Sequence, residues 1–327
     1  MSEDQRFFED VCACFDLGTV MAEPVVIDGG LSNRLYRVVT DRGEFAVKRM
    51  IANAGSAAFK SNVEASFVVE RLALAAGIAM PVPVPVLGST EALGGIMDGG
   101  EACWVRVHQW IEASKVTASD IDPGMVAQLG VILATLHRLP CSDPELSSPQ
   151  EPPAMDRAWQ MALSSHRNAA SLLDAIETLE DIVRRGYQAP RPGPVLSHRD
   201  LDAKNLLRDE CGNLIVIDWD AAGPTDAQWD AVIVAMDWSG IKEGAVSRQR
   251  FDTFLDAYVA AAGNLDPITP LSFAGWAEGM LDWLWFNLER RESTDASERD
   301  LGESEVEATT AFLPAAATWI MTQSFNR

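Results

Sequence analysis

The N-terminal part of the chain alternates short apolar runs with glycine-containing turns, a pattern typical of β-hairpins. A short amphipathic helix is expected first, over 4–15, because Phe8, Cys12 and Phe15 recur at helical spacing. Between the hairpins, apolar residues at helical spacing predict a longer helix over 56–76. The strands are expected at 25–27, 35–40, 44–48, 84–89 and 103–110.

The rest of the chain carries the apolar periodicity of helices. It predicts one helix over 123–138, one or two over 157–187, and a tryptophan-containing helix over 275–291. One hairpin interrupts this pattern, because the apolar runs 206–208 and 214–217 flank a turn. We therefore expect an α+β protein with a β-rich N-terminal part and a mainly helical C-terminal part.

The composition is that of an ordinary globular enzyme, with 47% hydrophobic and 23% charged residues, and 327 residues suffice for two lobes. No apolar run approaches the roughly 20 residues that span a bilayer. The start Met1-Ser2-Glu3-Asp4 does not resemble a signal peptide. We expect a cytoplasmic protein without a membrane partner.

The net charge is strongly acidic, at −22 from 26 basic and 48 acidic residues. Such a surface repels phosphate backbones, which argues against a nucleic-acid partner. It permits a cationic ligand, although acidic surfaces also serve solubility. The five cysteines are scattered, which predicts reduced thiols, and the four histidines lack the spacing of a zinc site.

The most specific signal is a stretch that begins with H-R-D-L-D-A-K-N at His198 and ends, after the predicted hairpin, with I-D-W-D. It follows the H-R-D-x-x-x-x-N pattern of kinase catalytic loops. In that pattern Asp200 would receive or orient the proton of an acceptor hydroxyl, and Asn205 and Asp218 would bind Mg²⁺. A short hairpin would place Asp218 beside Asn205. The alternative is a polar turn with solvated carboxylates.

A nucleotide-binding hairpin is predicted upstream. Gly29 and Gly30 lie in a turn between apolar strands, where glycines let backbone N–H groups approach phosphate oxygens. Lys48 ends the apolar run F-A-V-K, and a lysine in such a strand is costly unless it meets an anion. The later segment V-R-V-H-Q-W-I-E-A would offer backbone groups to a nucleotide base, at Gln109 and Ile111.

A carboxylate on the helix after Lys48 is expected to orient the lysine. Two glutamates are available. Glu64 falls in the register of the apolar stripe and is the preferred partner. Glu70 is the alternative, and it is otherwise expected to be solvated.

Together these motifs resemble the aminoglycoside phosphotransferase/choline kinase family. The resemblance covers 20–240 and rests on V-I-D-G-G-L-S-N-R-L-Y-R-V, F-A-V-K, Glu64, L-G-V-I-L-A-T-L-H-R-L-P, L-S-H-R-D-L-D-A-K-N and V-I-D-W-D, in the family's order. It implies a bilobal protein-kinase-like fold, with a nucleotide lobe over 1–108 and a helical lobe over 109–327 that carries the catalytic loop and the acceptor site. It also implies ATP, or GTP, with Mg²⁺, and transfer of the γ-phosphate to a small-molecule hydroxyl.

Carried over by position, the resemblance makes Lys48 the phosphate-binding lysine and Glu64 its partner. It also makes Asp200 the catalytic base and Asn205 and Asp218 the Mg²⁺ ligands. Asp230 is similar to the aspartate that braces the catalytic loop. One departure is Arg199, where the family more often has glycine, and its role stays open. The implied nucleotide loop contains Gly29, Gly30, Ser32 and Asn33.

The acceptor site is expected in the tryptophan-rich last third of the chain. Aromatic rings with carboxylates are suited to an amino-sugar, and the helix over 275–291 supplies three candidates: Asp282, Trp285 and Glu289. Core packing is the alternative for most of the tryptophans. His137, on the apolar side of its helix, is expected to be a hydrogen-bonded structural histidine.

The favoured acceptor is an aminoglycoside-like antibiotic or amino-sugar, and therefore a cationic molecule. A choline-like amino alcohol, a macrolide, a peptide antibiotic and a sugar metabolite are alternatives within the same chemistry. A nucleotide-binding regulator that transfers no phosphate is the alternative from a different class. The presence of the base, both metal ligands and the lysine argues against such a regulator.

Overall fold

The computed structural model describes residues 3–27, 33–51, 54–56, 58–141, 156–190 and 193–324. Two compact units make up the chain, and each consists of two separate segments. The first unit is Met1–Ala118 with His198–Gly223, and the second is Ser119–Ser197 with Pro224–Arg327. The candidate catalytic stretch therefore belongs to the same unit as the N-terminal sheet. The functional boundary expected between residues 108 and 109 stays a prediction.

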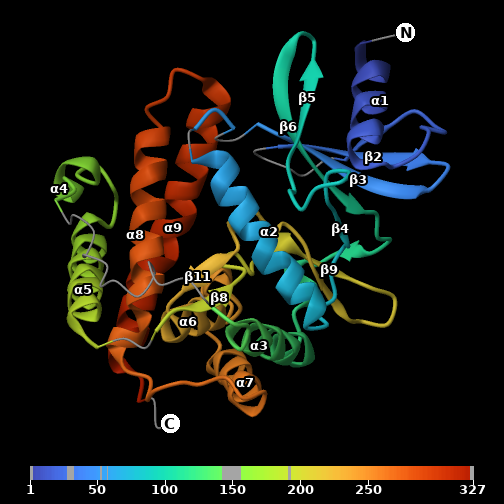
Figure 1. Ribbon diagram of the computed structural model, residues 1–327. Coiled ribbons are helices and arrows are strands. Elements are labelled where there is room, and N and C mark those ends of the chain that lie inside the picture. Colours follow the sequence, from blue (N-terminus) through green and yellow to red (C-terminus); the bar gives the residue numbers. More distant parts are fainter. Residues whose placement is uncertain are drawn as a thin grey trace. The chain divides into compact units, whose positions relative to one another are not determined.

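An antiparallel sheet forms the centre of the first unit (Figure 1). Its strands are β1 (Val25–Ile27), β2 (Arg34–Thr40), β3 (Gly43–Met50), β4 (Pro83–Val84), β5 (Gly94–Asp98) and β6 (Glu101–Gln109). The order is β1-β2-β3-β6-β4, and β5 also pairs with β6. The register sets Lys48 on β3 directly opposite Arg106 on β6. Residues that face each other in this way project from the same side of a sheet.

Helix α1 (Glu3–Phe15) packs on this sheet. Phe8, Val11 and Phe15 are buried in one apolar cluster with side chains of β2, β3, β5 and β6. The helix approaches β5 closely because Gly94 has no side chain. A Cβ at that position would lie 2.6 Å from the ring of Phe15. The amphipathic helix expected from the sequence is therefore confirmed.

A smaller sheet completes the first unit. It is formed by β7 (Ser114–Lys115), β9 (Leu206–Arg208) and β10 (Leu214–Val216), in the order β10-β9-β7. The predicted hairpin is thus present, and its inner side chains are buried. After β10 the chain forms the short helix η4 (Trp219–Ala221), which lies against α2 (Phe59–Ala75). The buried side of α2 faces this turn.

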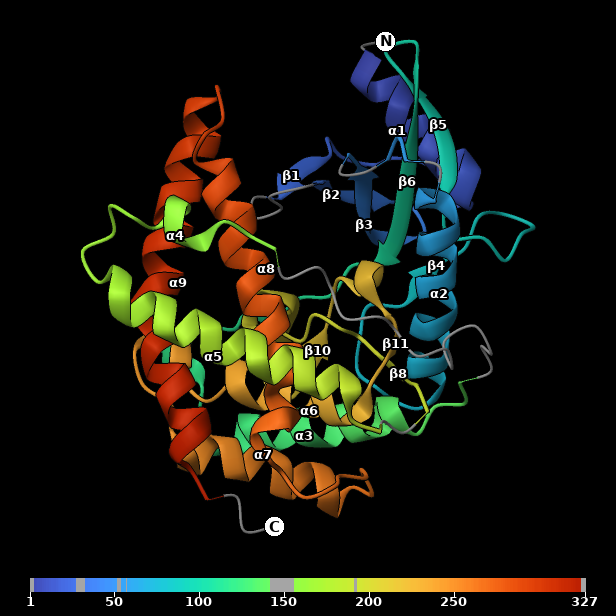
Figure 2. The ribbon, with the colours of Figure 1, turned by 90° about the vertical axis from the view of Figure 1, so that its left-hand side faces the viewer.

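The second unit is mainly helical. Its helices are α3 (Pro123–His137), α4 (Trp159–Ala162), α5 (Ala169–Gln188), α6 (Ala227–Asp237), α7 (Arg248–Ala260), α8 (Ala274–Arg290) and α9 (Ala296–Thr322). Its short strand β8 (Val195–Ser197) pairs with β11 (Gly223–Thr225), which begins at the last residue of the first unit. Helices α8 and α9 lie side by side, and α5 packs against both (Figure 2). Among the described residues, no helix is long and apolar enough to cross a membrane.

The α+β class is confirmed, but one expected strand is wrong. Of the residues 84–89, only Val84 belongs to a strand. Pro85 has no N–H to donate to a neighbouring strand. Gly88 then takes a left-handed backbone with φ 71°, so the chain turns instead of extending. Short alternating runs that contain proline are therefore poor evidence for a strand.

Candidate functional site

The loop from His198 to Asn205 is held in place by its own side chains. The amide nitrogen of Asn205 donates to Asp200 Oδ2 at 2.8 Å and to the Asp200 carbonyl at 2.9 Å. Lys204 Nζ lies 3.1 Å from the same Oδ2, and the Asp200 side chain is 39% exposed. The carboxylate therefore has a fixed orientation and still reaches solvent, as a base acting on a substrate hydroxyl requires.

The β9–β10 hairpin brings Asp218 back to Asn205. Beyond the last strand pair, the N–H of Ile217 donates to the carbonyl of Asn205 at 3.0 Å. Because the amide nitrogen of Asn205 is turned toward Asp200, its amide oxygen points away from that residue. One amide oxygen and one carboxylate are the hard oxygen donors that Mg²⁺ prefers. The two residues expected as metal ligands thus fit such an ion chemically and lie on adjoining chain segments.

Two residues of this region have a left-handed backbone, with φ 62° at Arg199 and 61° at Asp218. Non-glycine residues rarely adopt this conformation, because the side chain crowds the backbone. Arg199 Nε donates to the carbonyl of Ala221 at 2.7 Å. Its guanidinium lies over Gly223, where a Cβ would be 3.4 Å from Arg199 Cζ. The arginine, whose role was open, therefore ties the loop to the turn that follows Asp218.

Lys48 meets two carboxylates of that turn. Its Nζ lies 2.7 Å from Asp218 Oδ1 and 2.6 Å from Asp220 Oδ2. Burial alone would lower the pKa of Lys48, but the charges of Asp220 and Asp218 outweigh it and raise the pKa. The lysine therefore stays protonated and can neutralise a phosphate.

Asp220 connects Lys48 to a buried arginine. Its other oxygen accepts a hydrogen bond from Arg106, which is only 2% exposed. Burial alone would raise the pKa of Asp220, but Lys48 and Arg106 lower it to about 2. Arg106 also donates to Glu70 Oε2 at 2.6 Å, and Glu70 Oε1 lies 2.8 Å from His108 Nε2. Lys48, Asp220, Arg106 and Glu70 thus form a continuous row of alternating charges.

The expected contact between Glu64 and Lys48 is wrong. The Glu64 carboxylate instead accepts hydrogen bonds from the backbone N–H groups of Ala92, at 2.8 Å, and Leu93, at 3.0 Å. The expectation that Glu70 is solvated is also wrong, because its side chain is fully buried. Helical register places a glutamate on a face of α2, but it does not specify which partner that face meets.

The expected nucleotide contacts are only partly described. Asn33 Oδ1 accepts the N–H of Ile51 at 2.8 Å, which joins the start of β2 to the end of β3. Gln109 ends β6, where its N–H donates to the carbonyl of Val82 at 2.8 Å, and Ile111 follows this strand. Their nucleotide-binding roles stay predictions. Three loop residues lie outside the described part of the chain: Gly29, Gly30 and Ser32.

The expected acceptor residues lie on α8 in the second unit and contact protein groups. Asp282 forms an ion pair with Arg157, and its side chain is 52% exposed. Trp285 donates to Glu289 at 2.9 Å, and its ring packs edge-on against Trp159 at 5.1 Å. Their roles in acceptor binding stay predictions. A cationic acceptor would have to compete with Arg157 for Asp282.

A buried polar network lies elsewhere in the second unit. His137 Nε2 is 2.9 Å from Asp230 Oδ2, and His137 Nδ1 is 2.7 Å from the hydroxyl of Tyr258. The expectation that His137 is a hydrogen-bonded structural histidine is confirmed. The role of Asp230 as a brace of the catalytic loop stays a prediction.

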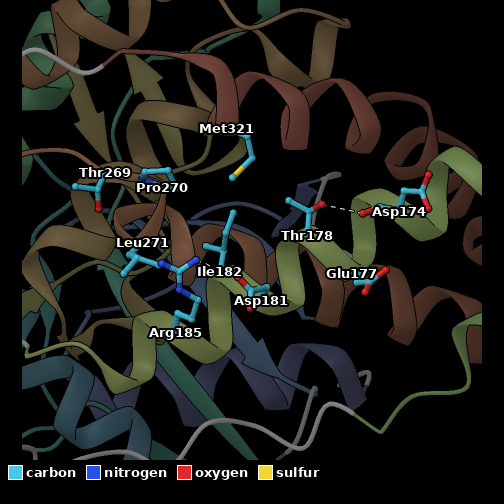
Figure 3. A pocket seen from close by; sticks show the side chains of 10 residues that line it. All are labelled: Asp174, Glu177, Thr178, Asp181, Ile182, Arg185, Thr269, Pro270, Leu271 and Met321. Carbon is cyan, nitrogen blue, oxygen red and sulfur yellow. Dashed lines mark hydrogen bonds and ion pairs between the residues drawn. The ribbon is translucent and has the colours of Figure 1, made fainter.

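The second unit also contains a pocket of about 800 Å³, between α5, η6 (Pro270–Phe273) and α9 (Figure 3). Acidic side chains of α5 line one side, among them Asp174 and Asp181, and Met321 of α9 contributes an apolar group. Asp181 is paired with Arg185 at 3.2 Å, which offsets part of this charge. The lining includes none of the residues that the sequence predicts for the site.

Asp220 and Arg106 were not among the site residues predicted from the sequence. A signal for each was present. Asp220 is the second acid of I-D-W-D, and Arg106 stands in the apolar strand V-R-V. The argument that a buried lysine needs an anion applies equally to a buried arginine. Their mutual contact could not be predicted, because it joins segments that are distant in sequence.

Comparison with known proteins identifies the family and the fold. Residues 24–280 match the phosphotransferase enzyme family. The fold is similar to that of an amicoumacin kinase bound to AMP-PNP and Ca²⁺, with 16% identity, a TM-score of 0.65, and coverage of 99% of this chain and 96% of that chain. It is also similar to a spectinomycin phosphotransferase bound to ADP and spectinomycin, with 16% identity, a TM-score of 0.67, and coverage of 96% and 98%.

A choline/ethanolamine kinase family protein from Mesorhizobium loti has the same fold, with 17% identity, a TM-score of 0.60, and coverage of 97% of this chain and 99% of that chain. The family match includes the sheet that carries Lys48 and the loop and hairpin that carry Asp200, Asn205 and Asp218. The chain therefore belongs to the phosphotransferase enzyme family and is a small-molecule kinase.

Proposed function

We propose that this protein transfers the γ-phosphate of ATP, or of GTP, to a hydroxyl of a cationic small molecule, with an aminoglycoside-like antibiotic or amino-sugar as the favoured acceptor. One observation carries the proposal. Asp200 is held by Asn205, and Lys48 contacts Asp218, all within a single compact unit. Phosphoryl transfer needs a base, oxygen ligands for magnesium and a cation for the phosphates. These four residues can supply all three.

The four residues would divide the tasks of phosphoryl transfer among them, and Asn205 would have two. Asp200 receives or steers the proton of the acceptor hydroxyl, and Asn205 keeps its carboxylate oriented. Lys48 neutralises phosphate charge. Asn205 and Asp218 would hold Mg²⁺, which when bound offsets the remaining negative charge of the phosphates. Positioning and electrostatics provide most of the rate enhancement, because the transferred phosphoryl group is loosely bonded in the transition state.

The nucleotide would lie against the β-rich lobe, residues 1–108. The loop from Gly29 to Asn33 would cover its phosphates, and backbone groups of Gln109 and Ile111 would meet its base. Residues 109–327 would form the helical lobe. This proposal suits a cytoplasmic enzyme, because ATP and magnesium are both available there.

Support for a cationic acceptor comes from charge and from the related proteins. The chain has an acidic excess of 22 charges, Glu289 places a carboxylate beside the indole of Trp285, and Asp282 lies on the same helix. The similar structures include an amicoumacin kinase, a spectinomycin phosphotransferase and a choline/ethanolamine kinase family protein. Antibiotics and amino alcohols are therefore the acceptor classes to test first.

An acceptor screen tests the proposal. Aminoglycosides, amino alcohols, macrolides, peptide antibiotics and neutral sugars are each incubated with protein, Mg²⁺ and ATP or GTP, and acceptor-dependent ADP or GDP release is measured. The matched control is Asp200→Asn, which should lose about a hundredfold or more in turnover and still bind nucleotide. ADP or GDP release with uncharged acceptors alone would contradict the proposal that the acceptor is cationic. Near-normal turnover of the Asp200→Asn variant would show that Asp200 is not the base.

A further inference from the structure

Arg106 is a buried cation at an unusual place in the sheet. It lies directly opposite Lys48 across β3 and β6, so two positive side chains leave the same face as neighbours. Arg106 is 2% exposed, and the Lys48 side chain is 16% exposed. Two like charges so close together and so little solvated are unfavourable unless carboxylates lie between or beside them.

Asp220 is the carboxylate between these two cations. One of its oxygens accepts from Lys48 at 2.6 Å, and the other accepts from Arg106. Arg106 in turn donates to Glu70 of α2, which is fully buried. A planar guanidinium can bond two carboxylates in fixed directions, which an ammonium group cannot do equally well. The guanidinium therefore links helix α2 to the turn that carries Asp220.

Asp218, the other partner of Lys48, is differently placed. Its side chain is 44% exposed, against 24% for Asp220. Under the proposed function, Asp218 also binds Mg²⁺, and a dication there would compete with the Lys48 ammonium for the carboxylate. Asp220 is held by two cations and stays with the lysine. The lasting anchor of Lys48 is therefore Asp220.

We propose that Arg106 is a positioning residue for Lys48, which it orients through Asp220, and that Glu70 supports Lys48 only through Arg106. Helix α2 thus acts on the lysine along a four-residue path instead of by direct contact. This inference rests on the proposed function of the site. It assigns to Arg106 an effect on nucleotide binding, although no nucleotide atom needs to touch it.

The test uses a charge-neutral double variant, Glu70→Gln with Arg106→Gln, which removes one charge of each sign. Its matched control is Arg37→Gln with Glu44→Gln, an ion pair on β2 and β3 of the same sheet whose side chains are 32% and 41% exposed. Thermal unfolding confirms that both proteins fold. The full chain without nucleotide is then treated with an amine-acylating reagent, and the labelling rate of Lys48 is followed by peptide mass spectrometry.

Lys48 should react faster in the Glu70/Arg106 variant, by roughly threefold or more, because an Asp220 that Arg106 no longer holds fixes the amino group less firmly and leaves it more accessible to the reagent. The dissociation constant of a fluorescent ATP analogue should rise roughly tenfold, because the lysine is no longer pre-oriented. The Arg37/Glu44 control should match the wild type in both measurements. Unchanged labelling and nucleotide affinity in a folded double variant would overturn the proposal.

If the double variant does not fold, the Arg106→Lys variant provides the test. Lysine keeps the positive charge but cannot bond Asp220 and Glu70 in the fixed directions of a guanidinium. Faster Lys48 labelling in this variant supports the proposal, and wild-type labelling overturns it. Neither labelling nor nucleotide binding requires an acceptor. A failed acceptor screen with altered labelling would therefore count against the proposed function, and a successful screen with unaltered labelling would count against the role of Arg106.

Discussion

Asp218 combines a left-handed backbone with a carboxylate that contacts Lys48. Asparagine tolerates this backbone nearly as well as aspartate. Asp218→Asn should therefore fold normally and still lose magnesium-dependent nucleotide affinity, because a neutral amide replaces a charged ligand of a hard cation. Nucleotide titrations with and without Mg²⁺ measure the effect. An equal dependence on magnesium in both proteins would exclude Asp218 from the metal site.

Arg199 permits a test of backbone strain. Arg199→Ala and Arg199→Gly both remove the hydrogen bond to Ala221, but only glycine accepts φ 62° without crowding. The glycine variant should be more stable than the alanine variant by about 1 kcal/mol. Urea denaturation measures the difference. Equal stabilities would show that the left-handed backbone at this position carries no strain.

Asp220 predicts a dependence of stability on acid pH. The pKa of its carboxyl is lowered from 3.8 to about 2 in the folded protein, where Lys48 and Arg106 outweigh the opposing effect of burial. A lowered pKa contributes stability above the unfolded value, and this contribution is lost as the pH falls from about 4 to about 2. The contribution is on the order of 2 kcal/mol.

Asp220→Asn checks this prediction. The difference in unfolding free energy between wild type and variant should be constant above about pH 5 and should shrink as the pH approaches 2. Denaturant titrations over this range measure it. A difference that does not change with pH would mean that the ion pairs of Asp220 do not contribute to stability.

At the residue scale, the sequence predicted the members of the site better than their contacts. Asp200, Asn205 and Asp218 could be identified because their spacing along one stretch is itself the signal. The choice of Glu64 over Glu70 failed, because both lie on one helix and only tertiary packing decides which of them meets a buried cation. Their functional roles stay predictions until variants are measured.

At the scale of elements, periodicity predicted helices such as α1 and α3 and the β9–β10 hairpin correctly. It wrongly predicted a strand over 84–89, and it did not predict how closely the helices pack. Helix α3 illustrates this. Gly130 faces α7, and a Cβ there would lie 2.5 Å from the carbonyl oxygen of Phe254 and 2.9 Å from the nitrogen of Tyr258. In the sequence this glycine is only a poor helix former. Its function in close helix packing is a tertiary property.

Two glycine substitutions in helices should therefore have opposite effects. Gly130→Ala should destabilise the protein by about 2 kcal/mol, because the neighbouring atoms belong to the backbone of α7 and cannot move aside. Gly279→Ala on α8 meets nothing within 4 Å and should stabilise by up to about 1 kcal/mol, because alanine favours helix. Thermal unfolding of both variants provides the comparison, and destabilisation by both would contradict the packing argument.

At the scale of the whole molecule, the acidic excess of 22 charges should influence acceptor binding. If the acceptor is cationic, its Michaelis constant should rise with ionic strength, because salt screens the attraction over about 10 Å at 0.1 M. The substitution Asp282→Asn should also raise the Michaelis constant of the acceptor and leave the Michaelis constant of the nucleotide unchanged. Glu292→Gln, which removes the same charge near the end of α8, is the control. Equal effects of both substitutions would indicate net charge instead of a specific contact.

The two-part composition of the first unit has a consequence for synthesis on the ribosome. A nascent chain emerges from its N-terminus, and domains tend to fold as they emerge. The strands that carry Lys48 and Arg106 are complete well before His198–Gly223 is made. During that interval Glu70 can already neutralise Arg106, whereas the two carboxylates that pair with Lys48, those of Asp218 and Asp220, have not yet been synthesised. The acids of the proposed active centre are therefore the last part of this unit to be synthesised.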